Sequence, residues 1–179
     1  MRIVLSGAQS TGKTTLLKEL KERKEFQNFV FVDEIVRTIK KQGFKINENG
    51  DDDTQHAIVN AHINNLKYDN CILDRCLLDS AVYTCYLYNH QKVGEETKKK
   101  ADLALALHAN DYDIIFYLAP EFEVVPDNVR STNKKFREEV VQNFEQYIKD
   151  YNLNVVRLKG TVEERLRQIQ KTIKEYYGN

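Results

Sequence analysis

Apolar residues gather along this chain into five short runs, most of which end in a polar or charged residue. Short runs rich in valine, isoleucine, phenylalanine and tyrosine are typical of β-strands. The run at residues 112–118 is apolar almost throughout, as expected of a strand buried on both faces of a parallel sheet. Strands are therefore predicted at Arg2–Ser6 and at residues 29–32, 70–75, 112–118 and 154–158.

Between these runs, apolar residues recur at helical spacing. The last helix opens with a capping box, in which Thr161 and Glu164 bond each other's backbone N–H groups. In the helix predicted at Glu95–His108, we expect Leu103, Ala104 and Leu107 to face the core. Helices are predicted at residues 15–20, Ile35–Lys41, 54–66, 77–87, Glu95–His108, 136–148 and from Thr161 onward.

Strands that alternate with helices predict a parallel sheet covered by helices on both faces. We therefore expect a three-layer α/β/α fold with a five-stranded parallel sheet. At 179 residues the chain is long enough for one such domain and short for two, so we assign residues 1–179 to a single domain. Its two prolines, Pro120 and Pro126, bracket a stretch that cannot be regular structure, and we expect a lid-like segment at about residues 120–137.

Charge and composition narrow the functional classes. Lys+Arg and Asp+Glu both count 27, so no overall positive charge draws the chain to nucleic acid or anionic lipid, although a local basic groove stays open. Three cysteines without metal-ligand spacing fit a reducing cytosol. The first strand begins at Arg2, which leaves no room for a signal peptide, and no apolar run approaches membrane-spanning length. We expect a cytoplasmic protein, and the sequence does not indicate its oligomeric state.

The segment from Gly7 to Thr14 fits the phosphate-loop pattern G-x-x-x-x-G-K-[ST] at every fixed position. It lies between a strand and a helix, where backbone N–H groups and the helix dipole converge on phosphate oxygens. Lys13 is expected to reach the β- and γ-phosphates of ATP, and the Thr14 hydroxyl to ligate Mg²⁺. The residues expected to bind the nucleotide are Gly7, Gln9, Ser10, Thr11, Gly12, Lys13, Thr14 and Thr15.

Charged residues end the second and third predicted strands, at Asp33, Glu34, Asp74 and Arg75. The carboxyl ends of parallel strands share one rim, so these side chains are expected near the phosphate loop. Glu34 or Asp33 is a candidate to take the proton of an acceptor hydroxyl. Asp74 follows an apolar run in the Walker B manner and is expected to hold Mg²⁺ with Thr14, while Arg75 would hold the acceptor or a phosphate oxygen. The alternatives are a helix cap for the first acidic pair and a local ion pair for Asp74 and Arg75.

Two arginines follow the fourth strand. Arg130 lies in the lid-like segment, and Arg137 lies one turn into the next helix. A closing lid excludes water and can bring an arginine to the transferring phosphoryl group, so we expect Arg130 to close the site. The alternative is an ordinary solvated connection.

Histidines and tyrosines add no clear site of their own. The histidines lack a spacing suited to a metal, and we interpret all four as structural or surface residues. One of the tyrosines that follow Arg75 could stack on a base, although core packing fits them better. These residues are His56, His62, His90 and His108, with Tyr83, Tyr86 and Tyr88.

Three stretches resemble a known family of AAA-type ATPases and kinases. That family includes the ribosylnicotinamide kinase domain of bacterial NAD-biosynthesis regulators and is often found as stand-alone phage proteins. Residues 7–15 match its phosphate loop, and residues 112–120 and 127–130 are similar to its fourth strand and the following Asp-Gly-x-Arg. Residues 32–37 resemble its Val-Pro-Glu-x-x-Arg segment, with Glu34 at the acidic position and Arg37 at the arginine.

The chain also departs from this family's pattern. Asp33 stands in place of the proline, and Asn128 in place of the glycine. Asp74 and Arg75 are similar to the acidic–Arg pair of deoxynucleoside and thymidylate kinases, so the resemblance reaches the wider group of nucleoside and nucleotide kinases. It does not choose between these substrates.

Together these features predict an ATP- and Mg²⁺-dependent kinase acting on a hydroxyl of a small nucleoside-like or nucleotide substrate, of ribosylnicotinamide or deoxynucleoside type. Two alternatives stay open. One is a polynucleotide 5′-hydroxyl kinase, for which residues 98–100, Lys134 and Lys135 are the visible basic clusters. The other is a regulatory ATPase with no acceptor other than water. The expected catalytic residues are Lys13, Glu34, Asp33, Asp74, Arg75 and Arg130.

Overall fold

The computed structural model describes residues 1–121 and 133–178, and this part of the chain contains a five-stranded parallel sheet. The strand order is β2-β3-β1-β4-β5, so β1 lies at the centre and the chain moves first to one side of it and then to the other. The strands are β1 (Arg2–Ser6), β2 (Val30–Val32), β3 (Cys71–Asp74), β4 (Ile114–Leu118) and β5 (Val155–Leu158). The predicted fold class is confirmed.

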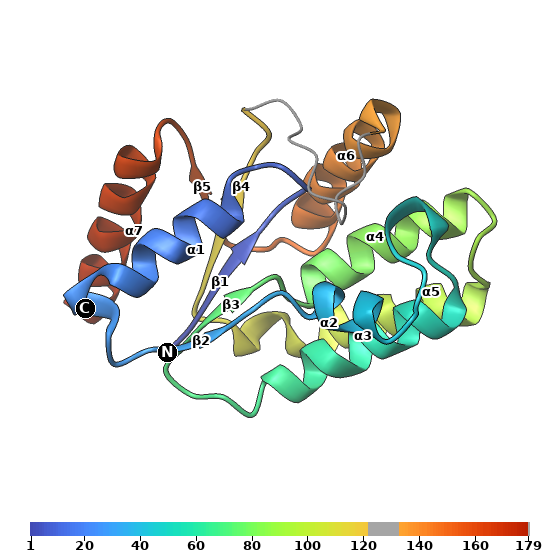
Figure 1. The fold of residues 1–179 in the computed structure, drawn as a ribbon, viewed down its shortest axis with the longest axis horizontal. Helices are drawn as coiled ribbons and strands as arrows, with labels where there is room; N and C mark the ends of the chain where they lie inside the picture. The colour runs from blue at the N-terminus through green and yellow to red at the C-terminus, as the bar shows by residue number, and fades with distance from the viewer. Residues whose placement is uncertain (122–132, 179) are drawn as a thin grey trace.

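Helices cover both faces of this sheet (Figure 1). Helices α1 (Lys13–Glu22) and α7 (Val162–Tyr177) lie on one face, and α4 (Leu77–Asn89) and α6 (Lys134–Asp150) on the other. Two more helices, α3 (Asp52–Asn65) and α5 (Glu95–His108), pack beside α4, and the short α2 (Ile35–Lys41) contacts α3. Single 3₁₀ turns occupy Lys24–Phe26, Asn47–Asn49 and Ala109–Asp111.

Alternation along the strands divides the core into two layers. On β1, Ile3 and Leu5 pack toward α1 and α7, whereas Val4 packs toward α4 and α6. The neighbouring strand β4 follows the same rule, with Phe116 in the first layer and Tyr117 in the second. Both layers are apolar, which explains why the central strands read as continuous apolar runs in the sequence.

One prediction about α5 is wrong. Leu103 and Leu107 were expected to face the core, but they are 59% and 68% exposed. The buried positions are Thr97, Ala101, Leu105 and, as predicted, Ala104, because α5 packs on α4 and α3 through a stripe that includes small residues. Alanines permit close approach of two helices, so the stripe that packs is offset from the stripe with the largest apolar side chains.

The carboxyl ends of β1, β2 and β3 meet at one rim of the sheet. β1 leads into the phosphate loop, β3 ends at Asp74, and β2 ends just before Asp33 and Glu34. Leu5 of β1 pairs with Asp74 of β3, which places this carboxylate beside the start of the loop.

Of the helices in the described part of the chain, none combines the length and the apolar character needed to cross a bilayer.

Candidate functional site

The loop between β1 and α1 has the tight curvature expected of a phosphate loop. Gly7 and Gly12 adopt φ angles of 137° and 90°, a region that disfavours side chains. A Cβ on Gly7 would lie 2.5 Å from the Leu118 carbonyl oxygen at the end of β4, so this position also lacks room for one. The backbone conformation therefore explains why glycine occupies both ends of the loop.

Lys13 lies folded back on this loop and is buried. Its Nζ donates to the carbonyl oxygens of Gly7 and Ala8, both at 2.6 Å, and to Thr11 Oγ1 at 3.2 Å. Burial, and then the positive charge of Arg75, lower the pKa of Lys13 to about 7. An anion beside Nζ favours the charged form, so this ammonium is suited to a phosphate group.

Arg165 of α7 holds the loop from behind, a role that sequence reasoning missed. Its side chain is fully buried; Nη1 donates to the Thr11 carbonyl at 2.6 Å, and Nη2 contacts Glu121 Oε2 at 2.7 Å. Glu121 also accepts from the Gly160 N–H, at 2.9 Å. The guanidinium thus joins the phosphate loop to the chain after β4 and to the start of α7.

We expect Arg165→Met to lower the free energy of unfolding by about 3 kcal/mol, because it removes a buried guanidinium that pairs with the partly buried Glu121 and leaves the Thr11 carbonyl unpaired. Urea unfolding measures this change. The matched control is Arg167→Met on the same helix, where the side chain is 70% exposed and lies 3.8 Å from Glu163. An equal loss of stability in both variants would contradict the role given to Arg165.

Asp74 is buried at the rim, and its Oδ1 has no hydrogen-bond partner among residues 1–121 and 133–178. Burial, and then the negative charge of Glu34, raise the pKa of Asp74 to about 6. It lines one small pocket together with the phosphate loop from Gln9 to Thr14. A buried, unpaired carboxylate oxygen that lines a pocket with Thr14 and the phosphate loop fits a Mg²⁺ ion that is shared with phosphate oxygens.

No group of three or more His, Cys, Asp or Glu side chains in the described part of the chain could hold a metal by itself. Mg²⁺ is commonly bound through one or two protein oxygens plus substrate phosphates, so Thr14 and Asp74 are sufficient protein ligands. Their assignment to the metal stays a prediction.

Asp74→Asn is expected to stabilise the protein in the absence of nucleotide and metal. The raised pKa means that ionising Asp74 costs stability, progressively from pH 4 to pH 6 and fully above that range. The variant should gain roughly 3 kcal/mol over the unchanged protein at pH 8, and the difference should vanish as the pH falls to about 4. Urea unfolding at several pH values with a chelator tests this, with Asp33→Asn as the control on the exposed side of the rim. A gain independent of pH would contradict it.

Glu34 and Arg75 face each other between the loop and the outer strand. Arg75 Nε donates to Glu34 Oε1 at 2.7 Å, and Arg37 lies 3.3 Å from Glu34 Oε2. Burial, the largest single effect, raises the pKa of Glu34, but the charge and hydrogen bond of Arg75 together with the charges of Lys13 and Arg37 outweigh it, so the pKa ends below its ordinary value. Glu34 is therefore ionised at neutral pH and is able to accept a proton.

Asp33, the other acidic candidate of β2, lies apart from this pair. Its side chain is 74% exposed and forms a 2.6 Å ion pair with Lys21 of α1. Neighbouring residues after an extended strand point in opposite directions, which sends Asp33 outward where Glu34 points inward. The structure thus separates two carboxylates that the sequence left equivalent.

Asp79 of α4 organises the site, and sequence reasoning did not single it out. Its fully buried carboxylate accepts from Ser6 Oγ at 2.8 Å, from the Cys76 N–H at 3.1 Å and from Arg75 Nη1 at 3.0 Å. Arg75 Nη1 also donates to the Gly7 carbonyl at 3.1 Å. The i, i+4 spacing of Arg75 and Asp79 on a helix start was the available signal.

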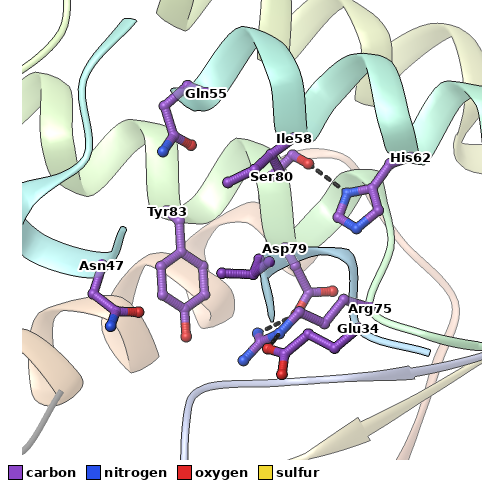
Figure 2. Close-up of a pocket in the computed structure, with 10 residues that line it drawn as sticks. Glu34, Asn47, Gln55, Ile58, His62, Arg75, Asp79, Ser80 and Tyr83 are labelled. Carbon is purple, nitrogen blue, oxygen red and sulfur yellow. Dashed lines mark hydrogen bonds and ion pairs between the residues drawn. The ribbon is translucent and has the colours of Figure 1, made fainter. Parts of the chain in front are cut away.

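A second pocket opens on the other side of Glu34 and Arg75 (Figure 2). It is lined by side chains from α2, α3 and α4. The end of this pocket away from Glu34 and Arg75 carries neutral groups, among them Asn47, Gln55 and Ile58. Tyr83 also lines this pocket, and its hydroxyl donates to Gln9 Oε1 of the phosphate loop at 3.0 Å. The two pockets share Glu34 and Arg75 and are therefore adjacent.

Arg137 approaches the phosphate loop from α6. Its Nη2 donates to the Ser10 carbonyl at 3.2 Å. This arginine thus contacts the phosphate loop from inside a regular helix. Arg130 and most of the predicted lid-like segment lie outside the described residues.

Sequence comparison relates the chain to one family. A family model described as AAA domain matches residues 2–165. Among curated proteins, the search finds no match.

Solved structures share the fold. Deoxyadenosine kinase from M. mycoides, with dCMP and dCDP bound, is 19% identical with a TM-score of 0.74, and the match covers 98% of this chain and 100% of that one. NadR protein in complex with NR has the same identity and TM-score, but this chain covers 52% of it while 99% of this chain is matched. YorR protein from Bacillus subtilis, with phosphorylated GDP, is 14% identical with a TM-score of 0.61, over 100% of this chain and 99% of that one.

Proposed function

We propose that this chain, which belongs to the AAA domain family, is an ATP- and Mg²⁺-dependent kinase. Its acceptor would be a hydroxyl of a small nucleoside-like or nucleotide molecule, of ribosylnicotinamide or deoxynucleoside type. The observation that carries the proposal is the adjacency of two pockets, one built on the phosphate loop and one closed by α2, α3 and α4, with Glu34 and Arg75 between them.

The phosphate pocket would hold the triphosphate of ATP. Loop N–H groups from Gly7 to Thr15 and the amino end of α1 supply donors, and Lys13 would exchange its carbonyl partners for β- and γ-phosphate oxygens. Arg137, whose Nη2 donates to the Ser10 carbonyl of the loop, is a candidate to contact the transferring group. Arg130 remains a second candidate for that role.

The second pocket, lined by α2, α3 and α4, would bind the acceptor and is called the acceptor pocket from here on. It would place one hydroxyl beside Glu34. The acceptor oxygen forms a bond to the γ-phosphorus while the bond from that phosphorus to the β–γ bridging oxygen breaks, and ADP leaves with the electron pair. Glu34 takes the proton of the hydroxyl and later releases it to water. Arg75, fixed by Asp79, holds Glu34 in place and offers its charge to the incoming oxygen.

Mg²⁺, when bound, would neutralise charge on the phosphate oxygens. Thr14 and Asp74 would hold it, since the Asp74 carboxylate is buried, lines the phosphate pocket and leaves one oxygen for a further contact.

The fold neighbours support a nucleoside-like acceptor. One is a deoxyadenosine kinase with nucleotides bound, and another is NadR protein bound to NR.

The basic clusters do not support a polynucleotide acceptor. Lys98 and Lys99 form ion pairs with Asp102 and Glu95 on the same helix, and Lys135 lies 3.9 Å from Glu139. Balanced charges of this kind are typical of a solvated helix face rather than of a groove for a phosphate backbone.

The test is a screen for ATP-dependent mass gain of one phosphate. The acceptors are ribonucleosides, deoxynucleosides, their monophosphates, ribosylnicotinamide and 5′-hydroxyl oligonucleotides. We expect a product with one or more of the small acceptors. A product with oligonucleotides only would transfer the proposal to polynucleotides, and ATP hydrolysis indifferent to every acceptor would overturn the kinase proposal.

A further inference from the structure

His62 presents an unused polar atom to the acceptor pocket. It lies on α3, and its side chain is only 2% exposed. Its Nδ1 lies 2.6 Å from Ser80 Oγ on α4. Its Nε2 is buried and has no hydrogen-bond partner within the described residues. Both residues line the acceptor pocket (Figure 2).

An unpaired polar atom in such a place is costly. Leaving a buried donor or acceptor unsatisfied costs about 1–3 kcal/mol, and proteins retain few such atoms without a reason. The ring is also prevented from turning away, because the Ser80 hydroxyl holds its other nitrogen. A fixed, dry and unpaired nitrogen beside a cavity is arranged to meet a group that the cavity receives.

The imidazole is uncharged in this setting. Burial lowers the pKa of His62 to about 4, although the negative charges of Asp79 and Glu34 act in the opposite direction. It therefore offers a neutral hydrogen bond rather than a charge, which suits a neutral partner.

The position of the ring indicates which part of the acceptor it would meet. The charges that act on His62 are those of Asp79, Arg75 and Glu34, the groups at the reacting end of the pocket. Figure 2 shows the ring on the same side as Glu34 and Arg75, with Asn47 and Tyr83 on the opposite side. In a nucleoside, the groups nearest to the reacting hydroxyl belong to the sugar, and the base is farther away.

We propose that His62 Nε2 hydrogen-bonds a second sugar hydroxyl of the acceptor, one that is not phosphorylated, and that Ser80 orients the ring for this contact. This inference rests on the proposed function and names a specificity-determining residue within it. A hydroxyl both donates and accepts, so it satisfies Nε2 in either tautomer of the ring. Because an analogue without that hydroxyl leaves the nitrogen unpaired, the pocket discriminates against it.

The experiment uses an acceptor that the unchanged enzyme phosphorylates, together with analogues of it that each lack one other sugar hydroxyl. His62→Leu should lower kcat/KM for the complete acceptor about 10- to 100-fold. It should leave kcat/KM nearly unchanged for the analogue that lacks the hydroxyl bound by Nε2, and it should leave the KM for ATP unchanged. His62→Gln, which keeps a polar group near Nε2, should restore part of the loss. His90→Leu, which alters an exposed histidine paired with Glu139, is the matched control.

Ser80→Ala keeps the test decisive if His62→Leu fails to fold. It frees the ring, and we expect a smaller loss of the same discrimination. Equal losses for the complete acceptor and every analogue, or no loss in any variant, would overturn the role of His62 while leaving the kinase proposal intact. An unchanged enzyme that phosphorylates no acceptor would overturn both.

Discussion

Lys13→Ala is expected to lower phosphoryl transfer by about a thousandfold or more. The ammonium would stabilise charge on the β- and γ-phosphates as the bond between them breaks, and a single donor placed at such a charge supplies about 10²–10³ in rate even when it is neutral. Turnover with the acceptor identified by mass gain measures the loss. Since Lys13 Nζ also bonds the Gly7 and Ala8 carbonyls, circular dichroism is needed to show that the loop variant is folded.

The matched control is Lys18→Ala on the exposed face of the same helix. It removes the same charge from α1 without touching the phosphate pocket, so its turnover should stay close to that of the unchanged protein. A Lys13→Ala variant that kept a tenth of the activity would show that the triphosphate is not held as proposed.

Glu34→Gln is expected to reduce kcat by about 10²–10⁴-fold, the usual contribution of a positioned general base. Glutamine keeps an oxygen to accept from Arg75, so the guanidinium and the loop should stay in place. What it loses is the ability to take the proton. ATP affinity, measured by calorimetry, should change by less than about threefold, because the carboxylate lies on the acceptor side of the phosphate.

Asp33→Asn separates the two neighbouring carboxylates. Asp33 is exposed and bonded to Lys21, so this variant should turn over normally. If Glu34→Gln phosphorylated the acceptor at the normal rate, the assigned base would be wrong, and Asp74 would become the carboxylate to test.

The sequence predicted the sheet well because each strand can be recognised from its own consecutive apolar residues. The five apolar runs reappear as β1 to β5; β1 keeps its predicted bounds, and the others are shortened by one or two residues where the flanking residues leave the ladder. The capping box at Thr161 and Glu164 is confirmed for the same reason, since all of its atoms lie within one turn. The convergence of Glu34, Asp74 and Arg75 with the phosphate loop followed from parallel topology.

The residues that sequence reasoning missed depend on contacts between distant segments. Arg165 bonds Thr11 across 154 positions, and Asp79 reaches Ser6 across 73. His62 was interpreted as structural, although Gln55, Ile58 and His62 share one face of α3. Polar residues in the inward stripe of a helix were a usable signal, but only the packing of α3 on α4 shows that a cavity lies between them.

The fold-back of Lys13 links nucleotide capture to acidity. Burial lowers the pKa of this side chain, and the charge of a triphosphate beside it would raise the pKa again and favour the ammonium form. Over the range just above neutrality, acidification therefore readies a larger share of the loops for an anion. The same internal bonds must be broken before any anion enters, so a lone inorganic phosphate gains less from the exchange than a polyphosphate, which reaches several donors at once.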